Sequence, residues 1–192
     1  MRLILASKSP RRIEILKKFV EFEVKPSNVE EKYSQNMKPN EVAMYLSLIK
    51  ALDVNEKVIE KDAVIVSADT IGVMEEILEK PKDRYEAFDF LKKLKNKTHR
   101  VITGYTIINQ NNFKKITDFE ETEVCFGEYD DSYINKYLDK KEYIDKAGGY
   151  AIQGYGKLLV KKIIGDYMNV VGFPIYSISN YLKKDFNIDL MK

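Results

Sequence analysis

The chain has 192 residues, which is long enough for one domain with a sizeable core. Its 32 Lys and Arg residues nearly balance 30 Asp and Glu residues, leaving a net charge of +2. No bulk field therefore attracts nucleic acid or a membrane surface, and no apolar run approaches the length of a membrane span. We expect neither kind of partner, and any recognition of an anion must be local.

Two rare residue types narrow the chemistry further. The single cysteine, Cys125, cannot form an internal disulfide, and the opening residues lack the features of a secretory signal, so we expect a cytoplasmic protein. The single histidine, His99, excludes a His-rich metal site and any mechanism that needs two imidazoles. Proton transfer and metal binding must then fall mainly to carboxylates.

The hydrophobic pattern predicts alternating strands and helices. In chain order we expect a strand over 2–6, a helix over 10–20, a short strand over 22–28, a helix from residue 40, a buried strand over 63–66 ending at 67–70, a helix over 83–95, a hairpin of 99–109 with 113–126, a helix ending near 138, a strand over 158–164 and a last helix over 175–184. This order predicts an α/β fold with a mixed sheet.

The turn after the first strand is a candidate anion site. Ser9 suits the N-cap of the following helix and Pro10 its first position, so Arg11 and Arg12 fall in the first turn, among unpaired backbone N–H groups. Two cations there oppose the helix dipole, which is tolerated most easily if an anion binds in the loop. The hydroxyls of Ser7 and Ser9 and two guanidiniums suit phosphate. The alternative is an ordinary capped, solvated helix start.

Two charged residues lie at the edges of apolar segments. Asp69 follows the buried strand that we expect over 63–66, where it could be catalytic or only a strand-end cap or turn residue. Lys50 follows Leu46 by one helical turn, at the edge of an apolar stripe, where it could bind a ligand or extend its stem along apolar surface.

Several ordered motifs resemble the Maf family of nucleoside triphosphate pyrophosphatases. The matching segments are Ser7 to Arg12, Val29-Glu30-Glu31, Lys50-Ala51, Ala68-Asp69-Thr70, Glu79-Lys80-Pro81, His99 to Thr103, Asp145 to Gly148, Tyr150 to Gly154 and Asn169 to Pro174. The resemblance covers nearly the whole chain. It implies an α/β structure of the Maf/ITPase-like kind, with a mixed, twisted central sheet flanked by helices and two lobes around a nucleotide cleft, in a single domain over 1–192.

The resemblance also implies the roles of the site residues. Ser7, Ser9, Arg11 and Arg12 would hold the triphosphate, with added charge from Lys50 and Lys80. Asp69 matches the catalytic carboxylate, and Glu31 matches its partner acid. Together they would hold Mg²⁺ or Mn²⁺, and we assign Asp69 as general base while allowing that it is chiefly a metal ligand. The expected products are a nucleoside monophosphate and pyrophosphate.

The base specificity that the resemblance implies is for dTTP and UTP. Arg11, Thr70 and Gln153 match the family's specificity positions, and an amide at residue 153 suits the imide edge of uracil or thymine, although it could also only fix the glycine loop. Gly149 stands where the family usually has Ala. The alternatives are a pyrophosphatase for 7-methyl-GTP or another purine nucleotide, and a non-catalytic nucleotide-binding regulator of cell division. A homodimer is our expectation because dimers are the commonest closed assemblies.

Overall fold

The computed structural model describes residues 2–59 and 62–191, and over them the chain forms an α/β fold around a mixed seven-stranded sheet. The strands follow the order β2-β1-β3-β5-β6-β7, and β4 pairs with β3. Their bounds are β1 (Arg2–Leu5), β2 (Glu23–Val24), β3 (Ala63–Val73), β4 (Ile77–Leu78), β5 (Thr98–Asn109), β6 (Lys115–Phe126) and β7 (Val160–Ile164). Strand β1 is parallel to β2 and β3, whereas β4 and β7 are antiparallel to β3 and β6. The predicted fold class is confirmed.

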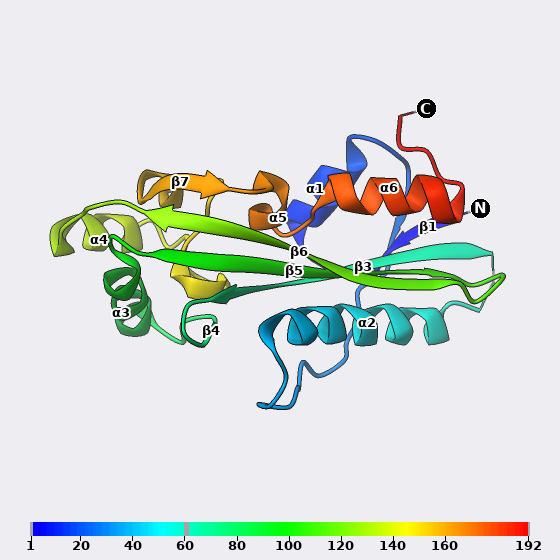
Figure 1. Cartoon of the computed structure of the whole chain (residues 1–192), viewed down its shortest axis with the longest axis horizontal. Helices are drawn as coiled ribbons and strands as arrows, with labels where there is room; N and C mark the ends of the chain where they lie inside the picture. Colours follow the sequence, from blue (N-terminus) through cyan, green and yellow to red (C-terminus); the bar gives the residue numbers. More distant parts are fainter. Residues whose placement is uncertain (1, 60–61, 192) are drawn as a thin grey trace. The chain divides into compact units, whose positions relative to one another are not determined.

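Helices flank this sheet (Figure 1). They are α1 (Pro10–Lys17), α2 (Pro39–Lys57), α3 (Arg84–Leu94), α4 (Asp131–Leu138), α5 (Tyr167–Val171) and α6 (Ile175–Phe186), with two short 3₁₀ turns, η1 (Ala147–Gly149) and η2 (Tyr155–Leu158). None of the described helices is long and apolar enough to cross a membrane.

The chain divides into two compact units. Unit 1 comprises residues 1–69, 103–120 and 172–192, and unit 2 comprises residues 70–102 and 121–171. Strands β3, β5 and β6 each contribute residues to both units. The expectations of a single functional domain over 1–192 and of a nucleotide cleft stay predictions.

Unit 1 packs helices on both faces of its part of the sheet. Figure 1 shows α2 on one face, with α1 and α6 on the other. Helix α2 lies very close to β5, because a Cβ added at Gly104 would be 2.2 Å from the Ala43 carbonyl oxygen. A side chain at residue 104 would therefore force helix and strand apart. Buried hydroxyls join the same layers, with Ser47 Oγ and Thr106 Oγ1 2.9 Å apart.

Unit 2 contains α3, α4 and a glycine-rich segment, residues 145–154. Both helices begin at an aspartate cap: the Asp83 side chain accepts hydrogen bonds from two backbone N–H groups of α3, and Asp130 accepts one from the Tyr133 backbone N–H. Helix α3 packs against α4 and η1. Gly149 in η1 has a φ of +73°, which favours glycine and explains why alanine is absent here.

Three expected boundaries are wrong. The short strand expected over 22–28 spans only Glu23–Val24. The strand expected to end at Val66 continues through Asp69 and Thr70 to Val73, so these residues lie within β3 and not in a loop. Every residue of this strand except Thr70 is buried, and Ser67 Oγ donates to the Ser47 carbonyl oxygen at 2.6 Å. Helix α1 ends at Lys17, and Phe19 beyond it is 40% exposed and does not continue an apolar helical face.

Candidate active site

The turn from β1 into α1 is organised by Ser7 and Arg12. Ser9 occupies the N-cap position and Pro10 the first turn, as predicted, but the Ser9 side chain makes no capping hydrogen bond. Instead Ser7 Oγ accepts from the Ser9 backbone N–H at 3.2 Å and from an Arg12 Nη1 at 3.4 Å. Arg12 Nε also donates to the Gly172 carbonyl oxygen at 2.8 Å. The guanidinium is thereby fixed beside the loop.

Arg12 interacts with both negatively and positively charged side chains. Burial lowers its pKa most, Asp69 and Glu31 raise it, and the neighbouring Arg11 lowers it further. Burial also lowers the pKa of Arg11. Both guanidiniums stay protonated, because arginine titrates far above neutral pH. The structure thus brings two arginines and two acids close enough to interact.

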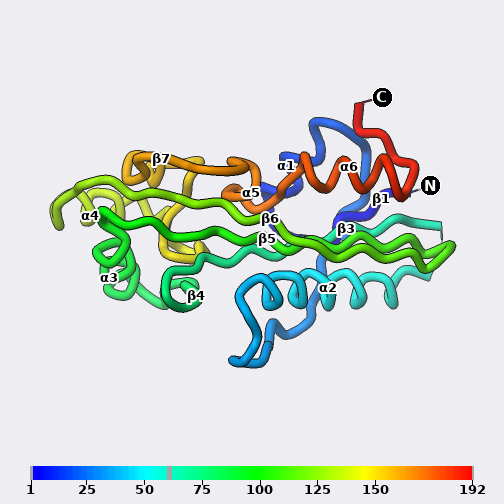
Figure 2. Tube along the Cα trace, viewed as in Figure 1, coloured from blue at the N-terminus to red at the C-terminus, as the bar shows by residue number. Residues whose placement is uncertain are grey.

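Lys50 joins the two acids. Its ammonium donates to Asp69 Oδ1 and lies 2.7 Å from Glu31 Oε1. The Lys50 and Asp69 side chains are only 13% and 11% exposed, whereas the Glu31 side chain is 48% exposed. Lys50 comes from α2 and Asp69 from β3, and Glu31 lies on the irregular segment between β2 and α2, whose path Figure 2 traces. Lys50 therefore reaches partners and does not merely cover apolar surface.

Unit 2 carries the other expected site residues. Thr70 begins this unit within β3, and the exposed Lys80 follows β4. The Gly148 N–H donates to the Glu79 carbonyl oxygen at 3.2 Å, so the Lys80 segment contacts the glycine-rich segment. Gln153 lies farther along that segment and is exposed. Within unit 2, Lys80 and Gln153 are thus on hydrogen-bonded neighbouring segments.

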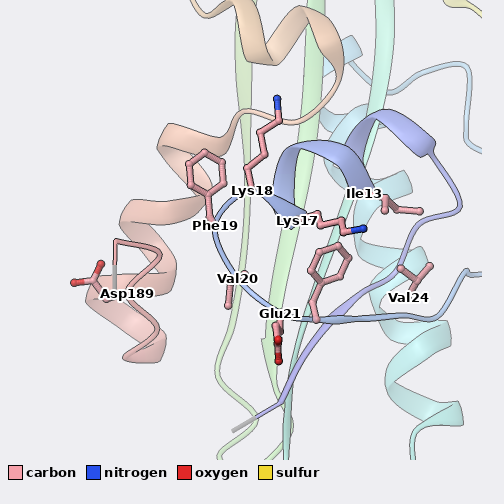
Figure 3. A pocket seen from close by; sticks show the side chains of 9 residues that line it. Ile13, Lys17, Lys18, Phe19, Val20, Glu21, Val24 and Asp189 are labelled. Atoms are coloured by element: carbon pink, nitrogen blue, oxygen red, sulfur yellow. The ribbon is translucent and has the colours of Figure 1, made fainter.

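A groove of about 1090 Å³ lies elsewhere on unit 1 (Figure 3). Its lining includes Ile13 and Lys17 of α1 together with Phe19, Val24 and Asp189. None of the expected site residues lines it. Its walls are apolar with two lysines and two acids at the edges, and they include neither Lys50 nor the acids that Lys50 contacts.

The donor set at Lys50 fits a hard divalent cation. Two carboxylates reach one ammonium, so one cation could contact both, and Mg²⁺ commonly takes one or two protein carboxylates and completes its shell with phosphates and water. Among residues 2–59 and 62–191 no group of three or more His, Cys, Asp or Glu side chains could hold a metal by itself. A cation bound here would therefore need oxygens from the substrate.

Comparison with known proteins identifies the family. The Maf-like protein family matches residues 2–185. The chain belongs to the Maf family. A Maf protein from a Thermoanaerobacter species, named dTTP/UTP pyrophosphatase, is 48% identical over an alignment covering 100% of both chains. Relatives with the same name from Alkaliphilus oremlandii and Acetivibrio thermocellus are 47% and 41% identical, the first covering 99% of both chains and the second 100% of this chain and 98% of its own.

Sequence reasoning missed one contact of the Maf chain's opening loop. The Gly172 carbonyl, which accepts from Arg12, comes from a segment 160 positions later. The signal was present, since Asn169 to Pro174 matches a family motif, but nothing in the segment gives the motif a charge or a reactive group. A backbone acceptor leaves no trace in the side-chain pattern.

Proposed function

We propose that the chain hydrolyses nucleoside triphosphates between the α and β phosphates, releasing a nucleoside monophosphate and pyrophosphate. The observation that carries this proposal is the Lys50 ammonium held between Asp69 and Glu31, with Arg12 in the same electrostatic cluster. Cleavage of a phosphoanhydride requires charge neutralisation and a positioned water more than covalent help, and these residue types supply both. The relatives named dTTP/UTP pyrophosphatase support the same reaction.

The triphosphate is proposed to bind at the opening loop. Arg11 and Arg12 neutralise its charge, and the hydroxyls of Ser7 and Ser9 donate to phosphate oxygens. Lys50 and Lys80 contribute further positive charge. The fixed position of Arg12 on the Gly172 carbonyl supports this assignment, because a held guanidinium loses little conformational freedom when the substrate binds.

Asp69 is proposed to be the general base. Its side chain is 11% exposed and lies within a strand, so its position varies less than that of a loop residue. It accepts a proton from the attacking water, and in the absence of substrate Lys50 compensates its charge. Glu31 and Asp69 would hold Mg²⁺ or Mn²⁺, which supplies charge neutralisation of the phosphates and lowers the pKa of bound water.

The base is proposed to be uracil or thymine, which makes dTTP and UTP the favoured substrates. The Gln153 amide can donate to a carbonyl and accept from an N–H, matching an imide edge, and Arg11 and Thr70 are proposed to complete the specificity. The exposed position of Gln153 leaves its amide accessible to a ligand.

A turnover panel tests the reaction. The purified chain is incubated with Mg²⁺ or Mn²⁺ and separately with dTTP, UTP, 7-methyl-GTP and GTP, and products are resolved by anion-exchange chromatography. Monophosphate and pyrophosphate in equal amounts from dTTP and UTP are the expected result. Orthophosphate as the primary product, or no turnover, would contradict the proposal. Faster turnover of 7-methyl-GTP would contradict only the base assignment.

We further propose that residues 1–192 act as one catalytic domain, as a homodimer and in the cytoplasm, the compartment that holds the proposed nucleotide substrates. With a net charge of +2 we propose no nucleic-acid or membrane partner. Light scattering of the purified chain measures the assembly, and a monomeric mass would contradict the dimer.

A further inference from the structure

The segment that carries Gln153 is held on both sides by side chains of unit 2. Before it, the Tyr150 hydroxyl lies 2.9 Å from His99 Nε2, and the Ala151 N–H donates to the Tyr137 hydroxyl at 3.0 Å. After it, the Tyr155 N–H donates to a Glu142 carboxylate oxygen at 2.7 Å. Gln153 itself is exposed, so the position of its amide depends on these neighbouring anchors.

Tyr150 is buried in an aromatic cluster that fixes its ring. The ring centroids of His99 and Phe126 lie 5.5 and 4.9 Å from that of Tyr150, each at 84° to its plane. His99 and Phe126 also contact each other, with centroids 5.7 Å apart. Edge-to-face contacts of this kind favour one ring orientation. The hydroxyl that meets His99 therefore has little freedom to move.

His99 is suited to a neutral hydrogen bond. It is 2% exposed, and burial lowers its pKa to about 4, so the imidazole is uncharged at neutral pH. Either His99 Nε2 or the Tyr150 hydroxyl can then donate. Because both partners are neutral, the hydrogen bond between His99 and Tyr150 places no charge beside the Gln153 segment that would attract phosphate.

Recognition of a base by an amide depends strongly on placement. Two hydrogen bonds to an imide edge require the amide to lie within a fraction of an ångström of its correct position. Gln153 lies two residues after Ala151 and three after Tyr150, so a shift of either anchor displaces it. Binding of the triphosphate by charges in unit 1 has no such requirement.

We propose that His99 and Tyr137 are positioning residues for base recognition: through the Tyr150 hydroxyl and the Ala151 N–H they hold the backbone that places Gln153. This inference rests on the proposed function, in which Gln153 contacts the base. Neither residue is proposed to contact the substrate. Their effect is on how well the base is bound and not on bond cleavage.

The test uses three variants that each remove one buried hydroxyl and keep the ring. Tyr150→Phe and Tyr137→Phe remove the two anchors. Tyr129→Phe is the matched control, because its ring contacts Phe126 in the same cluster, whereas its hydroxyl donates to the Leu91 carbonyl oxygen of α3 at 2.7 Å and not to the Gln153 segment. For each we measure kcat and KM with dTTP and UTP, inhibition by inorganic tripolyphosphate, and thermal unfolding.

Tyr150→Phe and Tyr137→Phe are expected to raise KM for dTTP and UTP about three- to tenfold, the usual effect of one lost hydrogen bond. Their kcat and the inhibition constant of tripolyphosphate, which has no base, should match those of the parent chain. Tyr129→Phe should lower the unfolding temperature comparably and leave KM unchanged. A merely structural role would give the three variants the same KM.

His99 provides a rescue experiment. His99→Leu should raise KM as Tyr150→Phe does, whereas His99→Gln, whose amide can replace the Nε2 contact, should restore KM substantially. Equal KM in both variants would overturn the assignment of His99, and equal weakening of dTTP and tripolyphosphate would overturn base positioning altogether. If the parent chain hydrolysed no nucleotide, the proposed function itself would fall. If the parent is active and all three phenylalanine variants behave alike, only the positioning inference falls.

Discussion

The two units hold their candidate site residues by opposite physical means. In unit 1, Lys50, Asp69, Glu31 and Arg12 form a network of full charges. In unit 2, the segment around Gln153 is held mainly by neutral hydrogen bonds and ring contacts. Full charges stabilise a triphosphate whatever base it carries, whereas neutral groups at fixed positions distinguish one base edge from another. The comparison predicts that different mutations can impair bond cleavage and discrimination between bases separately.

Asp69→Asn should produce the largest effect, a loss of about 10²–10⁴-fold in kcat, because an amide cannot accept the proton of the attacking water. Turnover of dTTP measures it. Asp118→Asn is the matched control, since Asp118 is also a unit 1 carboxylate and accepts from the Tyr181 hydroxyl at 2.8 Å, outside the charged network. Full activity of Asp69→Asn would refute its role as base.

Arg12→Ala should raise KM for dTTP about 10- to 100-fold, the effect of losing a charge-assisted contact. Tripolyphosphate should weaken by the same factor, because the loss concerns phosphate and not the base. Lys17→Ala, which removes an exposed cation from the same helix, is the control. If Arg11→Ala and Arg12→Ala both bound nucleotide normally, the opening loop would not be the triphosphate site.

Acidification should destabilise the fold through His99, which lies in unit 2. Its pKa falls from 6.5 in the unfolded chain to about 4 in the folded one, so below pH 6.5 the unfolded chain binds the extra proton and stability is lost progressively down to pH 4. The loss from this group is about 3 kcal/mol in total. Urea unfolding at several pH values should show a smaller dependence in His99→Gln, and identical curves would contradict a neutral buried imidazole.

Added salt should have the smallest effect on activity. It should distinguish triphosphate binding in unit 1 from base recognition in unit 2 without any mutation. Raising ionic strength screens charges, so tripolyphosphate inhibition should weaken by roughly several-fold between 0.05 and 0.5 M salt. The ratio of kcat/KM for dTTP to that for GTP should change by less than about twofold, because both bases are uncharged and we expect the neutral Gln153 amide to contribute more to their discrimination than Arg11 does. A ratio that followed the salt dependence of tripolyphosphate would place charge recognition at the base as well.

Local patterns in the sequence were sufficient for most of the helices and much of the sheet, but they extended the first helix to residue 20 and did not predict α5. The hairpin strands β5 and β6 lie within two residues of the bounds 99–109 and 113–126 that the sequence predicts. Strand β3 was misjudged because Ser67 and Asp69 resemble a turn in composition. Their partners, Ser47 and Lys50, are 20 and 19 positions away and satisfy these buried polar groups, which no local pattern reveals.

The candidate site divides in the same way. The residue types of the opening loop predict a phosphate site. The structure shows in addition that the Lys50 ammonium contacts both Glu31 and Asp69. In the sequence, His99 is only the single histidine and one member of a matching motif. Its partner Tyr150 is 51 positions later, so the link from His99 to the glycine-rich segment could be seen only in three dimensions.

The hydrogen bond from Arg12 to the Gly172 carbonyl oxygen can form only late in the synthesis of the chain. Unit 1 draws on the chain's first 69 residues and on residues from 172 onward, whereas all of unit 2 lies between residues 70 and 171. A ribosome makes the chain from the N-terminus, so every residue of unit 2 is synthesised before the last segment of unit 1 exists. The arginine loop is among the first parts made, yet it acquires this anchor only near the end of translation. A chain interrupted before residue 172 would contain the segment that we propose to recognise the base, but its arginine loop would lack the Gly172 contact.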